Sequence, residues 1–215
     1  IDVTDGSSPV TPNAVSVVGN TVTIEVPAGG GAPVGATLMK TGQTTSYRTG
    51  DDGDLEAGRA TDFFTLASNN PFGNTNRFTD ELGGQTYTND IVIDWSTYDG
   101  STVLGWRRTI TNSNWNNAID GALLVSIGTF TTGWRLSNIN ELTSIINWAA
   151  QRPLNYSPFN INASSSFWTS TTQSNSTSKA YAFQNNSYYI IGQFKSNSFA
   201  YIPCRTFTVT GTTLT

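Results

Sequence analysis

Residues 114–153 differ from the rest of the chain in their hydrophobic period. Apolar residues recur there at spacings of three and four, which is the pattern of a helix with one buried face. The first stripe comprises Trp115, Ala118, Ile119, Ala122, Leu123 and Ser126. The second stripe comprises Ile139, Leu142, Ile145, Ile146 and Ala149. The sequence therefore predicts two consecutive helices.

Both predicted helices have residues suited to their ends. Asn114 can cap the first helix, and Gly128 can end it. Asn138 can cap the second, with Glu141 three residues later in the spacing of a capping box. Pro153 then prevents the second helix from continuing.

The segments on either side of these helices have the composition of β-strands. Strand-like stretches before the helices are residues 37–39, 91–93 and 103–107, and those after them are 166–171, 179–184, 188–194 and 200–209. Segments rich in Gly, Ser and Asn separate them and favour turns. We therefore expect an α+β domain with two helices and an antiparallel sheet.

The N-terminal segment is predicted to be a separate small module. Residues 14–26 alternate apolar and polar around Gly19-Asn20, a pair suited to a tight hairpin turn. Residues 27–35 are rich in Gly and Pro and form a boundary. We expect a β-rich attachment module and linker over residues 1–35 and a binding domain over 36–215. The chain opens without a start methionine, so we expect it to be part of a longer or processed protein.

Several features of the composition argue against an enzyme and against nucleic acid as a partner. The chain has no histidine, the commonest general base and metal ligand, and Cys204 is its single cysteine. Its net charge is -4, which disfavours phosphate backbones and other polyanions. No apolar run reaches the length of about 20 residues that a membrane-spanning helix needs. We expect a non-enzymatic protein with no cofactor and no membrane insertion.

Two further groups of residues have mainly structural interpretations. Trp134, Leu136 and Trp168 are expected to anchor the core, and Arg205 to pair with Glu141. Asp51, Asp52 and Asp54 could hold calcium, but no ligand loop of about 12 residues follows them. The favoured interpretation is a solvated turn, so no metal site is predicted.

The segment from 173 to 201 is the candidate binding face. Tyrosine offers broad, rigid contact area and Ser and Asn offer adaptable hydrogen bonds, a composition that antibody binding loops share. The candidate ligand-binding residues are Gln173, Asn175, Lys179, Tyr181, Gln184, Asn185, Asn186, Tyr188, Tyr189, Asn197 and Phe199. Mostly uncharged contacts predict an affinity that varies little with salt. The alternative is that these polar residues serve solubility alone.

Four ordered segments resemble a known family. They read MKTGQTTSYRTGDDGDL at 39–55, GWRLSNINELTSII at 133–146, FWTSTT at 167–172 and IPCRTF at 202–207. They resemble the DUF1566 family, also called the Lcl C-terminal domain, over about residues 36–209. The resemblance implies a C-type-lectin-like fold, as found in bacterial surface proteins and in phage tail fibres or spikes that bind receptors.

The sequence departs from that pattern at two points. The helix position where many members carry a cysteine has none here, so Cys204 is expected to be a small buried apolar residue. The calcium-binding triplets of sugar-binding C-type lectins are absent, so calcium-dependent sugar binding is not implied.

Together these observations predict a receptor-binding module on the virion surface, at the tip of a phage tail fibre or spike. Its ligand would be a cell-surface glycan or protein, and the resemblance implies other virion or fibre subunits as further partners, with a homotrimer as one arrangement. The alternative is a structural virion or bacterial surface protein that contacts no receptor. A bacterial cell surface or a secreted location is the alternative to the virion.

Overall fold

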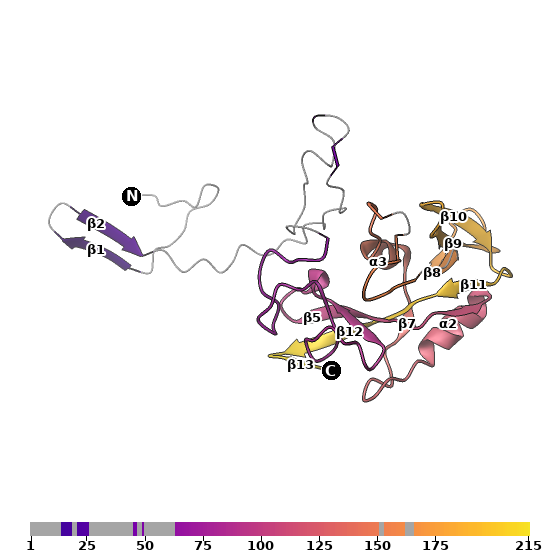
Figure 1. Cartoon of the computed structure of the whole chain (residues 1–215), viewed down its shortest axis with the longest axis horizontal. Coiled ribbons are helices and arrows are strands. Elements are labelled where there is room, and N and C mark those ends of the chain that lie inside the picture. Colours follow the sequence, from indigo (N-terminus) through magenta and orange to yellow (C-terminus); the bar gives the residue numbers. More distant parts are fainter. Residues whose placement is uncertain are drawn as a thin grey trace. The chain divides into compact units, whose positions relative to one another are not determined.

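A computed structural model describes residues 14–18, 21–25, 45, 46, 49, 63–150, 153–161 and 166–215 (Figure 1). The chain divides into two compact units, residues 1–37 and residues 38–215. In the first unit, strand β1 (Ala14–Val18) pairs antiparallel with β2 (Thr21–Glu25), and Val18 faces Thr21. This pairing confirms the predicted hairpin. The turn residues of the hairpin and the strand predicted at 37–39 lie outside the described ranges.

One of the two sheets described in the larger unit is antiparallel throughout, and the C-terminal strand lies at its edge. Its order is β13-β12-β5-β4-β3, and β7 also pairs with β12. The strands are β3 (Phe78–Thr79), β4 (Ile91–Asp94), β5 (Thr102–Arg107), β7 (Arg135–Leu136), β12 (Pro203–Thr210) and β13 (Thr213–Leu214). The strands predicted at 91–93 and 103–107 are confirmed as β4 and β5.

The other sheet has five strands in the order β10-β9-β8-β11-β6. They are β6 (Thr111–Ser113), β8 (Ser166–Thr172), β9 (Lys179–Gln184), β10 (Tyr189–Phe194) and β11 (Phe199–Tyr201). All pairs are antiparallel except β11 with β8. The single strand predicted at 200–209 is instead two strands, β11 and β12, because the chain passes from one sheet to the other at Ile202.

Both predicted helices exist, but both are shorter than their apolar stripes. The first, α2 (Trp115–Leu123), is capped by the Asn114 side chain, which accepts from the Asn117 N–H. Ala118 and Ala122 form its buried face. Leu123 is 58% exposed, so its place in the buried stripe was wrong. The helix ends at Leu123 and not at the predicted Gly128. Beyond the helix, Val125 is the next buried residue.

The second helix, α3 (Ile139–Ser144), begins with the predicted capping box. Asn138 accepts from the Glu141 N–H at 2.9 Å, and Glu141 accepts from the Asn138 N–H at 2.8 Å. The helix ends at Ser144, so Ile145 and Ile146, which are buried, belong to a non-helical segment. Ala149 is exposed. The prediction for Ala149 was therefore wrong, because the helical period stops before reaching it.

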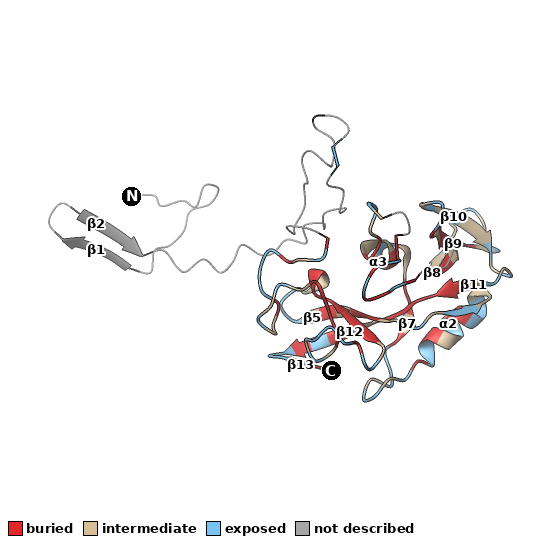
Figure 2. Cartoon of the chain, viewed as in Figure 1, coloured by how far each residue is buried: buried red, intermediate tan, exposed pale blue. Residues whose placement is uncertain are grey.

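The buried hydrophobic residues described in the larger unit form three clusters, and in Figure 2 the buried residues are the red parts of the ribbon. Trp134, Leu136 and Trp168 are buried, which confirms that they anchor the fold. With two α-helices in the described part of the chain and two sheets, the domain is α+β. None of the helices described is long and apolar enough to cross a membrane.

A buried ion pair, which the sequence does not reveal, joins the six-stranded sheet to the end of α3. Arg77 donates from Nε and Nη2 to the two carboxylate oxygens of Asp94, each at 2.9 Å, and both side chains are fully buried. Arg77 also donates to the carbonyl of Ser144 at 2.7 Å. Burial by itself lowers the pKa of Arg77, but Asp94 more than compensates and raises it. Arg77 therefore stays charged inside the protein.

The predicted ion pair of Arg205 with Glu141 was wrong. Glu141 pairs with Arg135, whose Nη2 lies 2.5 Å from its Oε1, and not with Arg205. Cys204 lies opposite Arg135 in the β12–β7 register, and alternation along β12 turns Arg205 to the other face. There its guanidinium lies over the rings of Phe130 and Phe207, at 5.0 and 4.8 Å. Cys204 is a free, buried thiol, as predicted, and burial raises its pKa.

Candidate functional site

The segment predicted to bind a ligand forms the hairpin of β9 and β10 and the turns around it. Tyr189 lies opposite Gln184, and Phe194 lies opposite Lys179. Among the described strands, β10 has a neighbour on one side only, so it is an edge of the five-stranded sheet. Figure 1 shows β10 at the outer end of this sheet.

The predicted residues differ widely in exposure. Exposed residues are Asn175, Asn186 and Tyr189; half-buried residues are Gln173, Lys179, Tyr181, Gln184, Tyr188, Asn197 and Phe199; Asn185 alone is buried. The structure thus brings most of them to the surface of one hairpin and its flanking turns.

Asn185 is a correction to the predicted site. It is 1% exposed, and its Oδ1 accepts from the backbone N–H of Leu154 at 3.2 Å. A buried amide of this kind satisfies a backbone group that would otherwise lack a partner. Asn185 therefore holds the hairpin turn against residues 153–161 and cannot meet a ligand.

Two other predicted residues act mainly in packing. Phe199 lies against Trp168, with ring centroids 4.8 Å apart, at the margin of a buried cluster. The carboxamide of Gln173 lies over Gly192, where a Cβ atom would come within 2.0 Å of Oε1. Glycine at 192 therefore lets the end of β8 approach β10 closely.

Sequence reasoning missed the most exposed apolar residues of the site, Ile191 and Phe194. They are 37% and 54% exposed, beside Tyr189 at 46%. All three belong to β10, which carries no charged residue. The signal was available, because successive side chains of a strand point to opposite faces, so Tyr189 and Ile191 share one face of β10 and Phe194 lies on the other. The prediction concentrated on Tyr, Asn and Gln and passed over the aliphatic and Phe positions.

Two lysines lie at one end of the hairpin, each over an aromatic ring. Lys179 Nζ is 4.7 Å from the Phe194 ring centroid, and Lys195 Nζ is 3.9 Å from that of Trp115. Lys195 also donates to the Thr172 hydroxyl at 3.1 Å. Cation–π contacts of this kind restrict a flexible side chain and leave its charge unneutralised. Neither lysine has an ion pair within the described residues.

The family comparison can be set against this geometry. The family model of the Lcl C-terminal domain matches residues 96–205, half of the chain. The chain belongs to the Lcl C-terminal domain family, also called DUF1566. No curated protein sequence matches it.

The match of the Lcl C-terminal domain is narrower than the resemblance predicted. It contains the segments at 133–146 and 167–172 and ends within the one at 202–207, but it does not reach the segment at 39–55. It includes α2, α3 and the whole β9–β10 hairpin. The candidate binding hairpin is therefore part of the family domain and not an addition to it.

The turn of the hairpin contains a strained backbone. Tyr188 has a φ of 59°, a left-handed conformation that is uncommon for a bulky side chain. The N–H groups of Ser187 and Tyr188 both donate to the Gln184 carbonyl, which fixes the turn. Strain of this kind persists only where the surrounding structure enforces it, and it is concentrated at functional sites.

This strain predicts an order of stability for variants at position 188. We expect Tyr188→Asn to match or exceed the parent, because Asn tolerates positive φ, and Tyr188→Val to lose about 1–2 kcal/mol. Urea unfolding of the three proteins measures the order. Tyr189→Val is the matched control, since Val is favoured in a strand, and it should leave stability within about 0.5 kcal/mol. A Tyr188→Val protein as stable as the parent would contradict the assignment of strain.

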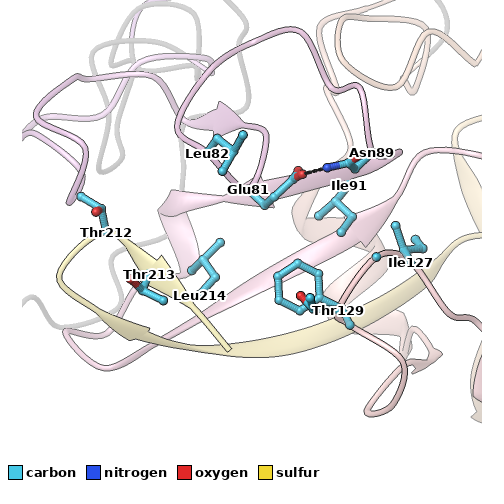
Figure 3. Close-up of a pocket in the computed structure, with 11 residues that line it drawn as sticks. Glu81, Leu82, Asn89, Ile91, Ile127, Thr129, Thr212, Thr213 and Leu214 are labelled. Atoms are coloured by element: carbon cyan, nitrogen blue, oxygen red, sulfur yellow. Dashed lines mark hydrogen bonds between the residues drawn. The ribbon is translucent and has the colours of Figure 1, made fainter.

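A pocket of about 400 Å³ lies on another part of the domain (Figure 3). Its lining comes from the loop between β3 and β4, from residues 127–130 and from the C-terminal end of the chain. Glu81 accepts a short hydrogen bond from Asn89, and most of the other lining is apolar or neutral. No residue between 173 and 201 lines it. Sequence patterns do not reveal this pocket, because its lining residues are far apart along the chain.

The calcium candidates Asp51, Asp52 and Asp54 lie outside the described residues. Within the described ranges, no group of three or more acidic or Cys side chains is placed to hold a metal ion. The described part of the chain thus offers two surface features for function, the edge hairpin and the pocket.

Proposed function

We propose that this chain is a non-enzymatic receptor-binding module with a C-type-lectin-like domain. The β9–β10 hairpin and its flanking turns contact a cell-surface glycan or protein. In this proposal the module lies at the virion surface, at the tip of a phage tail fibre or spike. The observation that carries it is the exposure of Tyr189, Ile191 and Phe194 on one uncharged edge strand.

The support comes from the contrast between this strand and the layer beneath it. Ala180, Ala182 and Phe183 of β9 are buried, as is Trp168 of β8. The exposed side chains of β10 are thus carried on a rigid base, and they lose little conformational freedom on binding. Aromatic contacts on a rigid scaffold are the most effective anchors in protein interfaces.

The strain at Tyr188 and the burial of Asn185 support the same proposal. A strained turn that is fixed by a buried amide displays Asn186 and Tyr189 in one conformation. Preorganisation of this kind raises affinity because the ordering cost is met during folding.

The test is attachment of the full chain to host cells. Replacing Asn186, Tyr188 and Tyr189 together with Ser, Asn and Ser is expected to reduce attachment by about tenfold or more. A matched triple replacement of Ser126, Thr131 and Thr132 with Ala is expected to leave attachment unchanged, because these exposed residues lie outside residues 173–201. Unchanged attachment by the first variant, with thermal unfolding like the parent, would reject the proposal.

A structural role in a virion or bacterial surface layer is the second candidate. Exposed Ile191 and Phe194 would also suit packing against a neighbouring subunit. The triple variant at 186, 188 and 189 distinguishes the two roles. If it loses assembly with neighbouring subunits but still attaches to host cells, the structural role is favoured.

A further inference from the structure

The outer edge of β10 presents backbone groups that have no partner. The Lys195 N–H donates to the Ser178 carbonyl, so residues 195, 193, 191 and 189 turn their backbone groups toward β9. Ile190, Gly192 and Phe194 consequently turn theirs outward. The Phe194 carbonyl accepts from the Asn197 N–H, and the other outward groups have no hydrogen bond within the described part of the chain.

Among the residues that the structure describes, this edge lacks the features that natural proteins use to prevent strand pairing. Such edges usually carry charged side chains, Pro or a bulge, or they lie under a covering loop. The sequence of β10 is YIIGQF, and it pairs with β9 without a register shift. An edge of six residues without these safeguards is suited to accept another strand.

The charge of the chain is segregated around this edge. All fifteen acidic residues lie at or before Glu141, and the chain after it contains Arg152, Lys179, Lys195 and Arg205 but no acidic residue. Lys179 and Lys195 lie at the same end of the hairpin, without an ion pair in the described residues. An otherwise acidic protein is thus locally positive where β10 ends.

We infer that β10 docks an extended segment of a partner protein as an added strand. The segment alternates apolar and polar residues and carries acidic side chains at the end that meets Lys179 and Lys195. This rests on the proposed function and selects a protein ligand for it. Backbone hydrogen bonds to Ile190, Gly192 and Phe194 supply affinity that does not depend on the side chains of the segment, and the lysines set its direction. It also adds a moderate salt dependence, beyond what an uncharged face would give.

Amide exchange measured by NMR on the full chain tests this inference directly. The probe is a synthetic acetylated peptide of alternating Thr and Val that ends in two Glu residues, and its counterpart ends in two Lys residues. The acidic peptide is expected to slow exchange at the amides of Gly192 and Phe194 by about tenfold or more, and the basic peptide far less. The amide of Ile191, which already faces β9, serves as the internal control.

Two variants at position 194 separate the contribution of the backbone N–H to peptide binding from that of the side chain. Phe194→Pro removes an outward N–H and Phe194→Ala keeps it, while both remove the ring. We expect the proline variant to bind the acidic peptide about tenfold more weakly than the alanine variant, the effect of one hydrogen bond of about 1–1.5 kcal/mol. Unchanged exchange at the Ala182 amide in both variants shows that β9 is intact.

Three outcomes would overturn the inference. They are equal protection by the acidic and basic peptides, no protection by either, and protection that appears on raising the protein concentration alone, which would identify a second copy as the occupant. If the triple variant at 186, 188 and 189 loses host attachment but Phe194→Pro does not, receptor binding stands and strand addition fails. If neither variant affects attachment, the proposed function fails as well.

Discussion

Replacing Arg77 with methionine is expected to lower the free energy of unfolding by about 3–5 kcal/mol, because it leaves the Asp94 carboxylate buried without its cation. Both side chains are fully buried, and Arg77 makes two hydrogen bonds to Asp94. Burying an unpaired charge is far more costly than losing a contact at the surface. Urea denaturation of the Arg77→Met variant measures the change.

The ion pair of Arg107 with Asp90 provides the control. Its N–O distance is 3.3 Å, and both side chains are partly exposed. Arg107→Met should therefore change stability by no more than about 1 kcal/mol. Adding Asp94→Asn to Arg77→Met should recover part of the loss, since the amide is neutral and can still accept from Ser96. A loss for Arg77→Met no larger than that for Arg107→Met would contradict this account.

Replacing Trp168 with alanine is expected to lower the free energy of unfolding by about 3–5 kcal/mol and to loosen the β9–β10 hairpin. The indole is fully buried beside Ala182, its partner across the β8–β9 pair. Its Nε1 donates to the Ser113 carbonyl at 3.1 Å, so the substitution also leaves a backbone acceptor without this donor. Thermal unfolding reports the global loss, and faster amide exchange along β9 reports the local one.

Trp148 is the matched control for this substitution. It is 42% exposed and meets Phe183 at the edge of its ring, with centroids 6.1 Å apart. Trp148→Ala should cost about 1 kcal/mol and leave exchange along β9 unchanged. Similar losses for the two tryptophans would mean that the packing of β8 against β9 does not depend on Trp168.

The sequence predicted the local elements of this fold better than their ends. The Asn138–Glu141 capping box and the strands at 91–93 and 179–184 follow from short-range patterns, and the structure confirms them. The ends of α2 and α3 were misplaced because apolar residues beyond a helix can be buried from a turn, as Ile145 is. Side-chain periodicity alone does not distinguish these two cases.

Long-range contacts could not be predicted from the sequence, because they depend on how distant segments are aligned. The partner of Glu141 depends on the register of β12 against β7, which determines that Cys204 and not Arg205 faces Arg135. The burial of Asn185 depends in the same way on where residues 153–161 lie. Composition singled out residues 173–201 as the candidate site, but it could not tell which amide meets solvent and which one supports the turn.

The passage of the chain through Ile202 has a mechanical consequence. Strands β10, β11 and β12 follow one another along the chain. They lead from the edge of the five-stranded sheet to an inner strand of the six-stranded sheet. Tension applied at β10 therefore reaches β12, which is hydrogen-bonded to β5, β7 and β13. A pull on the edge strand β10 would thus be passed along the chain to a strand that is held by three neighbours.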